Sequence, residues 1–159
     1  MANPIKTPEQ LLAYRPLKDL LAVKGNAVYA AAPTDSVFTA ISLMADHGVG
    51  FLVVMDGKRL VGVLSERDYA RKVVLMGRSS KETPVSEILT EPLIAISPDT
   101  SVDEAMRLIT THRIRHLPVM RHGELEGLIS IGDLVQWIAF AQDQTIEDLS
   151  HYIEGKYPC

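Results

Sequence analysis

The chain repeats itself with an offset of 65 residues. Residues 33–68 align with residues 98–133 without a gap, and 13 of the 36 aligned positions carry the same residue. Chance would give roughly two or three identities at ordinary residue frequencies. A short segment ahead of each copy also matches, because LKDLL at 17–21 resembles VSEIL at 85–89. A duplication of this size predicts two similarly folded units within the 159 residues.

The first half of each copy predicts a strand followed by a helix. Apolar stretches at 28–31 and 93–96 end before a proline, and a helix-start signal follows at Ser36 and Ser101. Apolar residues then recur at intervals of three and four, which is typical of a helix with one buried face. These residues are Val37, Ala40, Ile41 and Met44 in the first copy, and Val102, Ala105, Met106 and Ile109 in the second. Gly48 is placed to end the first helix in the left-handed conformation.

The second half of each copy predicts two more strands and a second helix. The second strands lie at 51–55 and 117–120, and the third strands at 60–64 and 125–129. Asp56-Gly57 and His122-Gly123 supply the turns, and a helix follows from Ser65 and from Ser130. The predicted order in each copy is therefore β-α-β-β-α.

This order predicts a mixed α/β fold made of two units. A three-stranded sheet with helices on one side leaves an apolar face, so we expect the units to pack sheet to sheet with pseudo-twofold symmetry. The expected divisions are an N-terminal extension (1–16), the first unit (17–80), the second unit (81–140), and a C-terminal helix and tail (141–159). Ile146, Leu149, Tyr152 and Ile153 give that last helix an apolar face, which packs on the chain's own core or on a second copy.

Composition excludes several classes of protein. Lys and Arg number 16 against 20 Asp and Glu, a net charge of -4 that argues against a nucleic-acid partner. The single cysteine, Cys159, excludes an internal disulfide and a cysteine-based metal cluster. No apolar run approaches the 18 or so residues of a membrane span, and the first residues lack the apolar core of a signal peptide. We expect a cytoplasmic protein with no metal and no membrane contact.

The sequence carries none of the common catalytic motifs. Gly-x-Ser-x-Gly, His-Glu-x-x-His, Cys-x-x-Cys and the phosphate-loop pattern are absent. His112 and His116 have a spacing of four, but a strand is predicted to begin between them, so one helical face does not carry both. We expect no catalytic residues and no enzymatic activity.

The pattern Gly-h-h-Ser-x-x-Asp, where h is apolar, occurs at residues 62–68 and again at 127–133. A serine that starts a helix, with an acid three residues later, is the pattern of a capping box, which is a sufficient structural explanation. A functional explanation is also open. A helix start presents backbone N–H groups, a serine hydroxyl can bond a phosphate, and a carboxylate can accept from two vicinal ribose hydroxyls.

The duplicated β-α-β-β-α order, the stretch IRHLPV at 114–119 and the two Gly-h-h-Ser-x-x-Asp patterns resemble a tandem pair of cystathionine β-synthase-type (CBS) domains, known as a Bateman module. The resemblance covers about residues 17–140. The stretch SERDY at 65–69 resembles the small stand-alone bacterial proteins that contain little besides the CBS pair.

The resemblance implies binding of adenosine-containing ligands such as AMP, ADP, ATP or NAD in two clefts between the units. Asp68 and Asp133 would each hold a ribose diol, with Ser65 and Ser130 beside the ribose or phosphate. The segments 24–29 and 90–94 would face adenine largely through backbone groups. The other implied site residues are Tyr29, Val49, Gly50, Phe51, Val63, Arg67, Ile94, Ile114, Arg115, His116 and Leu128.

The two implied sites differ in charge. Arg115 and His116 could bring positive charge to the Asp133 site, and Arg67, with Arg71 one turn further on, could do so at the Asp68 site. Each of these residues also has a structural explanation: Arg71 and Lys72 as solvated surface, His47 and His112 as helix-end residues, Tyr69 and Trp137 as core or interface.

Two functions follow from these expectations. The first is a non-catalytic regulatory module whose bound nucleotide changes a dimer surface or the surface for an unknown downstream protein. The second is a structural dimerisation module in which the Ser-x-x-Asp pairs only cap helices. A homodimer is expected in both cases, from the family and from the apolar helix faces.

Overall fold

The computed structural model describes residues 15–25, 27–91 and 94–140. These residues form two compact units, one of residues 15–25, 96–119 and 128–140, the other of residues 27–91, 94–95 and 120–127. The predicted mixed α/β class is confirmed, whereas the packing of one sheet on the other stays a prediction. Residues 1–14 of the predicted N-terminal extension and the helix predicted after residue 140 lie outside the described residues.

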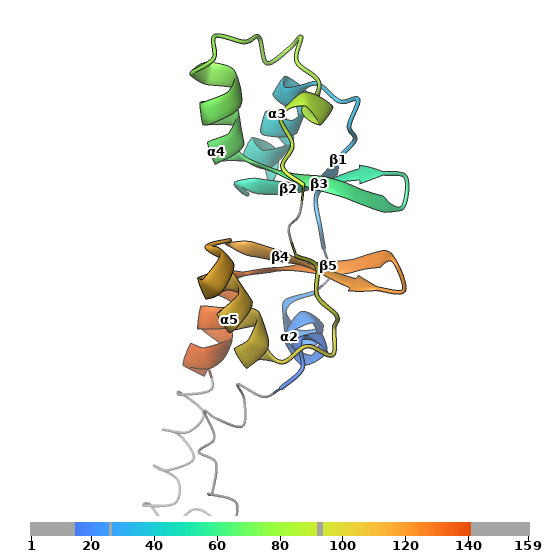
Figure 1. Cartoon of the computed structure of the whole chain (residues 1–159), viewed down its shortest axis with the longest axis vertical. Coiled ribbons are helices and arrows are strands. Elements are labelled where there is room, and N and C mark those ends of the chain that lie inside the picture. The colour runs from blue at the N-terminus through green and yellow to red at the C-terminus, as the bar shows by residue number, and fades with distance from the viewer. Residues whose placement is uncertain (1–14, 26, 92–93, 141–159) are drawn as a thin grey trace, which may run out of the picture. The chain divides into compact units, whose positions relative to one another are not determined.

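The first copy of the repeat folds in the predicted order (Figure 1). Its elements are strand β1 (Ala30–Ala31), helix α3 (Val37–His47), strands β2 (Phe51–Asp56) and β3 (Arg59–Ser65), and helix α4 (Glu66–Tyr69). The sheet order is β1-β2-β3, with β1 parallel to β2 and β2 antiparallel to β3. Strand β1 is shorter than the predicted strand at 28–31.

The second copy contains helix α5 (Val102–His112), strands β4 (His116–Arg121) and β5 (Glu124–Ser130), and helical residues 131–140. Within the described residues its sheet has two strands, and Ile96 adds only an isolated parallel bridge to Val119. The predicted first strand of this copy, at 93–96, is therefore wrong as a strand and is reduced to this bridge.

Pro118 explains why the first strand of the second copy is reduced to a bridge. In the first copy the N–H of Val53 donates to the carbonyl of Tyr29 at 3.2 Å, next to the paired residues of β1 and β2. The residue at the equivalent position of the second copy is Pro118, which has no N–H to donate. Pairing is reduced to the bridge at Ile96, whose N–H donates to the Pro118 carbonyl at 3.0 Å.

Serine side chains begin α3 and α5, as predicted. The Oγ of Ser36 and that of Ser101 each accept a hydrogen bond of 3.1 Å from the N–H three residues later. Helix α3 ends at Gly48 with φ 64°, and α5 ends at Arg113 with φ 53°. Glycine adopts this left-handed conformation freely, whereas a residue with a Cβ is strained in it. The second copy therefore keeps a strained arginine where the first copy has glycine.

The predicted apolar faces of both helices are buried. On α3 the buried residues are Val37, Ala40 and Met44, with Ile41 partly buried. On α5 they are Val102, Ala105 and Ile109, with Met106 partly buried. The fully buried strand residues Leu52, Val54 and Leu64 belong to the same core as α3. Helix packing on one face of the sheet thus forms the core of the first copy.

The segment ahead of the first copy closes the second copy. Helix α2 (Leu17–Lys24) follows Pro16 and lies in the same unit as α5 (Figure 1). The N–H of Leu17 donates to the Thr100 carbonyl at 2.8 Å, and the N–H of Val102 donates to the Arg15 carbonyl at 2.9 Å. Leu17, Leu20 and Leu21 are the buried residues of α2.

The segment between the copies closes the first copy in the same way. It contains a short 3-10 helix, Val85–Glu87. The N–H of Val85 donates to the Asp35 carbonyl at 2.8 Å, and the N–H of Val37 donates to the Thr83 carbonyl at 2.9 Å. The two copies therefore use equivalent hydrogen bonds, but each is completed by a segment that lies outside the aligned 36 residues.

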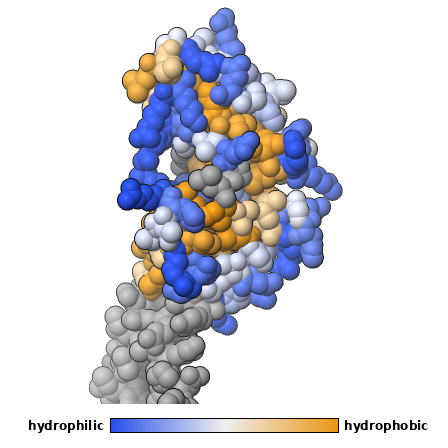
Figure 2. Space-filling model, viewed as in Figure 1, coloured by the Kyte–Doolittle hydropathy of each residue, from blue (hydrophilic) through white to orange (hydrophobic). Residues whose placement is uncertain are grey.

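Helix α4 continues into a π-helical turn, Ala70–Val74, which the sequence pattern did not predict. The N–H of Leu75 donates to the carbonyl of Ala70 at 3.0 Å, a span of five residues. At its end, Leu75 and Met76 are 78% and 69% exposed. Figure 2 shows apolar groups on the surface at this end of the unit, near the top of the view.

Candidate functional site

Two capping boxes occupy equivalent positions, at the start of the last helix of each copy. Ser65 Oγ accepts from the Asp68 N–H at 3.1 Å, and the Asp68 carboxylate accepts from the Ser65 N–H at 3.0 Å. Ser130 and Asp133 make the same two bonds at 3.1 and 2.8 Å. The structural explanation of the Ser-x-x-Asp pattern therefore holds in both copies. The groups around each carboxylate decide what else it can do.

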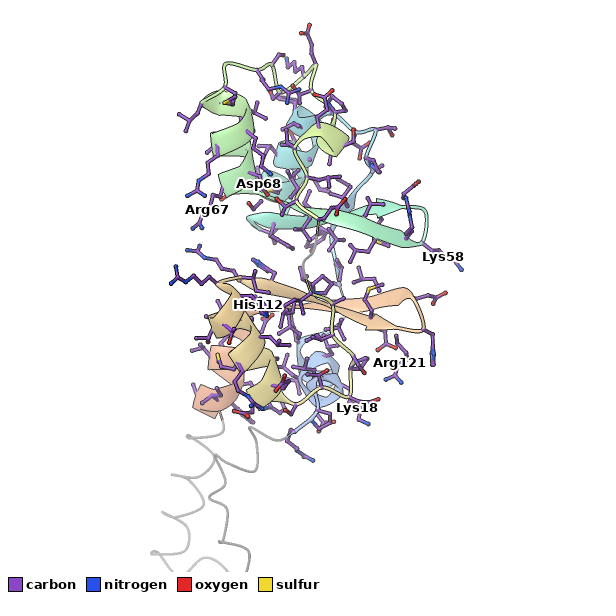
Figure 3. All side chains as sticks on the ribbon, viewed as in Figure 1. Lys18, Lys58, Arg67, Asp68, His112 and Arg121 are labelled. Carbon is purple, nitrogen blue, oxygen red and sulfur yellow. The ribbon has the colours of Figure 1, made fainter. Side chains whose placement is uncertain are left out.

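A lysine and a threonine hold the carboxylate of Asp68. Lys72 Nζ lies 3.4 Å from Asp68 Oδ1, and Thr90 Oγ1 donates to the same oxygen at 3.3 Å. Lys72 also donates to the carbonyl of Ile88 at 3.0 Å and to Thr90 Oγ1 at 3.1 Å. Neutral oxygens therefore share the Lys72 ammonium with the carboxylate. Arg67, predicted to bring charge here, is exposed, and Figure 3 shows it and Asp68 at the start of α4.

A different lysine holds the carboxylate of Asp133, and it comes from α2. Lys24 Nζ lies 2.5 Å from Asp133 Oδ2 and donates to the Leu128 carbonyl at 2.6 Å. The lysine side chain is 33% exposed and that of Asp133 is 17% exposed. This ion pair joins the end of α2 to the start of helical residues 131–140.

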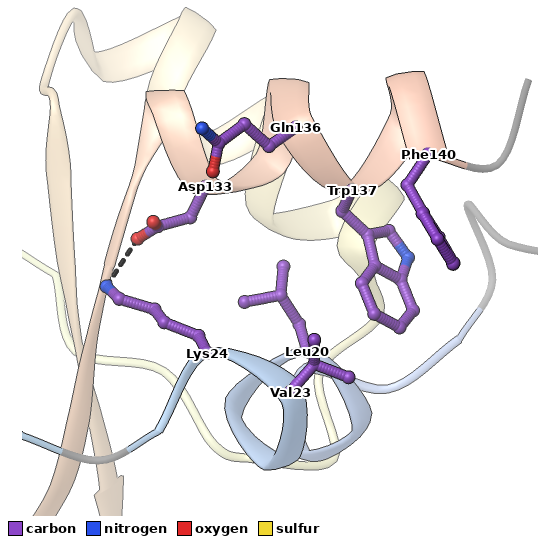
Figure 4. Close-up of a pocket in the computed structure, with 7 residues that line it drawn as sticks. All are labelled: Leu20, Val23, Lys24, Asp133, Gln136, Trp137 and Phe140. Atoms are coloured by element: carbon purple, nitrogen blue, oxygen red, sulfur yellow. Dashed lines mark hydrogen bonds and ion pairs between the residues drawn. The ribbon is translucent and has the colours of Figure 1, made fainter. Parts of the chain in front are cut away.

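The Lys24–Asp133 pair lines a pocket of about 460 Å³ between α2 and helical residues 131–140 (Figure 4). The other lining residues are Leu20, Val23, Gln136, Trp137 and Phe140. The pocket therefore combines apolar and aromatic walls with one carboxylate, one ammonium and one amide. Such a mixture is typical of small-molecule sites, in which a few polar groups orient a ligand among apolar walls.

The pKa of Asp133 is lowered despite its position. Burial by itself raises the pKa of this carboxyl, but the hydrogen bond from Lys24, the Ser130 N–H and the charge of Lys24 together outweigh burial. Asp133 is therefore ionised at neutral pH, and its carboxylate can accept hydrogen bonds from hydroxyl groups.

His116 lies within electrostatic range of the same pair. Burial is the main cause that lowers the pKa of His116 from 6.5 to about 4, and the positive charge of Lys24 lowers it further, against the charge of Asp133. His116 is therefore neutral at pH 7. Without a ligand His116 therefore brings no positive charge to this site, because a buried imidazole beside an ammonium does not hold its proton, and its role beside a bound phosphate stays a prediction.

The space beside Gly50 is filled by Glu66. A Cβ on Gly50 would lie 3.2 Å from Glu66 Oε2, and the Gly50 carbonyl accepts from the Glu66 N–H at 3.0 Å. In the second copy the Arg115 carbonyl accepts from the Ile131 N–H at 2.9 Å. With the serine caps, two of the first three N–H groups of each helix are thus bonded within the protein. Fewer backbone donors remain for a phosphate than the sequence pattern alone predicts.

Tyr29 lies against the end of α3. Its ring stacks on that of His47, with centroids 3.9 Å apart and 18° between the planes. Tyr29 is 38% exposed, and the helix-end position of His47 agrees with the structural explanation considered for it.

The remaining predicted residues are spread over the two units. Arg115 is exposed, and the partly buried residues are Val49, Phe51, Val63, Ile94, Ile114 and Leu128. The Leu128 carbonyl accepts a hydrogen bond from Lys24 at the Asp133 site. Val63 and Thr90 are joined by two backbone hydrogen bonds. Their role in clefts between the units stays a prediction.

Lys24, Lys72 and Thr90 were not predicted to contact the aspartates. Lys72 could have been found, because it follows Asp68 by four residues and so lies on the same helix face. No local signal marks Lys24, whose approach to Asp133 depends on α2 closing the second copy.

Within the described ranges, no group of three or more His, Cys, Asp or Glu side chains is arranged to hold a metal ion. None of the helices in this part of the chain combines the length and apolar character that crossing a membrane requires.

Comparison with known proteins identifies the family. The CBS domain family matches residues 18–75 and 85–140. The mitochondrial CBS domain-containing protein CBSX3 of Arabidopsis thaliana is 36% identical over 164 residues, covering 98% of this chain and 80% of that protein. A solved structure from Burkholderia ambifaria, described as a candidate signal-transduction protein with CBS domains, is 51% identical with a TM-score of 0.70, covering 76% of this chain and 90% of that one.

A hexameric CBS-CP12 protein from bloom-forming cyanobacteria is 26% identical with a TM-score of 0.65, and the match covers 76% of this chain and 69% of that one. The duplicated β-α-β-β-α order and the paired Ser-x-x-Asp caps agree with these matches. The chain therefore belongs to the CBS-domain family, of which it contains two domains.

Proposed function

We propose that this chain is a regulatory module that binds adenosine-containing nucleotides, such as AMP, ADP, ATP or NAD. The observation that carries the proposal is the pocket in which an ionised Asp133 and Lys24 lie beside Trp137 and apolar walls. A carboxylate suits vicinal ribose hydroxyls, and aromatic and apolar walls suit a purine. The pocket volume of about 460 Å³ lies within the range that drug-sized ligands occupy.

A signal-transduction role is supported by the Burkholderia relative. A ligand that binds one arrangement of the chain better than another shifts the population toward that arrangement. The output we propose is a change in self-association or in a surface for another protein. The hexameric cyanobacterial relative supports self-association as that output, and a homodimer is the smallest assembly that would provide it.

The test uses Asp133→Asn, which keeps the size of the side chain and a capping oxygen but removes its charge. We expect nucleotide affinity to fall by about 1–3 kcal/mol, because the hydroxyls lose a charged acceptor. Asp103→Asn is the matched control, since Asp103 is an aspartate of α5 in an ion pair with Arg107 and outside the pocket lining. Calorimetry measures both affinities, and circular dichroism checks that both variants fold.

A thermal-shift assay with AMP, ADP, ATP and NAD tests binding in the unaltered chain. A ligand that binds only the folded state must raise the melting temperature. If none of the four does so, the proposal is wrong and the Ser-x-x-Asp pairs act only as helix caps in a structural dimerisation module. Equal affinities for the Asp133→Asn and Asp103→Asn variants would remove Asp133 from the binding site.

A further inference from the structure

Lys24 ties the end of α2 to the start of the last helix. Its ammonium bonds the Asp133 carboxylate and the Leu128 carbonyl at 2.5 and 2.6 Å. Two thirds of the Lys24 side chain and most of that of Asp133 are withdrawn from water. A charge that loses its partner in such surroundings is more costly than one at the surface.

The surroundings of the pair offer few substitutes for Asp133. The other residues that line the pocket carry no charge: Leu20, Val23, Gln136, Trp137 and Phe140. At the helix start, the N–H groups of Ile131 and Asp133 are bonded to the Arg115 carbonyl and to Ser130 Oγ. The Gly132 N–H between them carries no net charge. The charge of a ligand phosphate would therefore have to be met by a side chain, and Lys24 is the cation among the described residues that line this pocket.

From these contacts we propose that Lys24 makes the Asp133 pocket select phosphorylated nucleosides over neutral nucleosides. The inference rests on the proposed function, because it takes ligand hydroxyls to reach Asp133. As they do so, the Lys24 ammonium gives up part of its bonding to that carboxylate. A neutral nucleoside returns nothing to the ammonium, whereas a phosphate supplies both acceptor oxygens and the opposite charge.

Electrostatics act in the same direction. A phosphate near Asp133 is repelled by the carboxylate, and the Lys24 ammonium offsets that repulsion. Without Lys24 the carboxylate still repels a phosphate but has no such effect on a neutral nucleoside. Removing the Lys24 charge must therefore weaken AMP relative to adenosine.

The Asp68 site provides an internal comparison. The Lys72 ammonium keeps the Ile88 carbonyl and Thr90 Oγ1 as partners when the Asp68 carboxylate turns to a ligand, and its side chain is more exposed than that of Lys24. Lys72 therefore loses less when its aspartate is taken. This predicts weaker selection for phosphate at Asp68 than at Asp133.

The experiment measures the affinities of AMP and adenosine by calorimetry in an Asp68→Asn background, so that the Asp133 site alone reports. We expect Lys24→Met to lower the ratio of AMP to adenosine affinity at least about tenfold, the equivalent of about 1.4 kcal/mol. Lys24→Arg, which keeps the charge, should restore most of the ratio. Lys18→Met is the matched control, because Lys18 lies on the same helix in an exposed pair with Asp99.

The two proposals fail in different ways. If AMP and adenosine both fail to bind the unaltered chain, the proposed nucleotide function is wrong, and the Lys24 inference falls with it. If both bind and Lys24→Met leaves their ratio the same as Lys18→Met does, only the role of Lys24 is overturned. Melting temperatures of all variants, measured without ligand, exclude unfolding as the cause of a lost ratio.

Discussion

Gly62 is a position where one added methyl group should destabilise the chain measurably. A Cβ on this residue would lie 2.6 Å from Leu89 Cδ1 and 2.8 Å from the Thr90 carbonyl oxygen. The leucine side chain can rotate away, but the Thr90 carbonyl is fixed because it accepts from the Val63 N–H at 2.8 Å. Gly62→Ala must therefore push two paired backbone segments apart. Overpacking of this kind costs about 1–3 kcal/mol.

Urea unfolding followed by circular dichroism measures this cost. Thermal unfolding gives a second measure, because for a chain of this length each kcal/mol of lost stability lowers the melting temperature by about 2–4 °C. Gly132→Ala is the control, since the nearest atom to its Cβ would be Ser130 Oγ at 3.5 Å, an ordinary contact within a helix. That change should stabilise the chain by about 0.5–1 kcal/mol, because glycine is a poor helix residue. A Gly62→Ala variant as stable as the unaltered chain would refute the close approach of Thr90 to β3.

Two further changes should alter stability in opposite directions. Arg113→Gly should raise the free energy of unfolding by up to about 1 kcal/mol, because Arg113 has φ 53° where the first copy has Gly48. Urea unfolding measures this change. A lower free energy of unfolding would instead mean that the arginine side chain stabilises the fold. The pKa of His116 is about 4 in the folded chain and 6.5 when unfolded, so between these values the unfolded state binds the extra proton and stability falls as the pH falls. The free energy of unfolding should fall by about 2–3 kcal/mol between pH 7 and pH 4. This fall should be missing from the His116→Gln variant. Equal dependence of stability on pH in the two proteins would show that His116 is not withdrawn from water.

The repeat and its serine caps predict α3 and α5 well, because both signals are local. A cap at Ser36 or Ser101 needs only the N–H three residues later, and the buried faces follow from helical spacing. The shortened first strand of the second copy could also have been anticipated. Pro118 occupies the middle of the neighbouring strand and cannot donate the hydrogen bond that Val53 provides in the first copy.

The candidate site was predicted only in part, because its charges depend on long-range contacts. The two aspartates are visible in the sequence as the acids of paired capping patterns. Their lysine partners are not equivalent: Lys72 comes from the same helix as Asp68, whereas Lys24 lies 109 positions before Asp133. The neutral state of His116 likewise depends on burial and on Lys24, which no local pattern reveals.

The way α2 closes the second copy bears on the order in which the chain can fold during synthesis. The backbone bonds that close the first copy, such as Val85 to Asp35 and Val37 to Thr83, are all available once residue 91 has been made. Leu17 is made before the first copy, whereas its acceptor Thr100 is made after it. Helix α2 therefore cannot make its bonds to the second copy while the first copy is being completed.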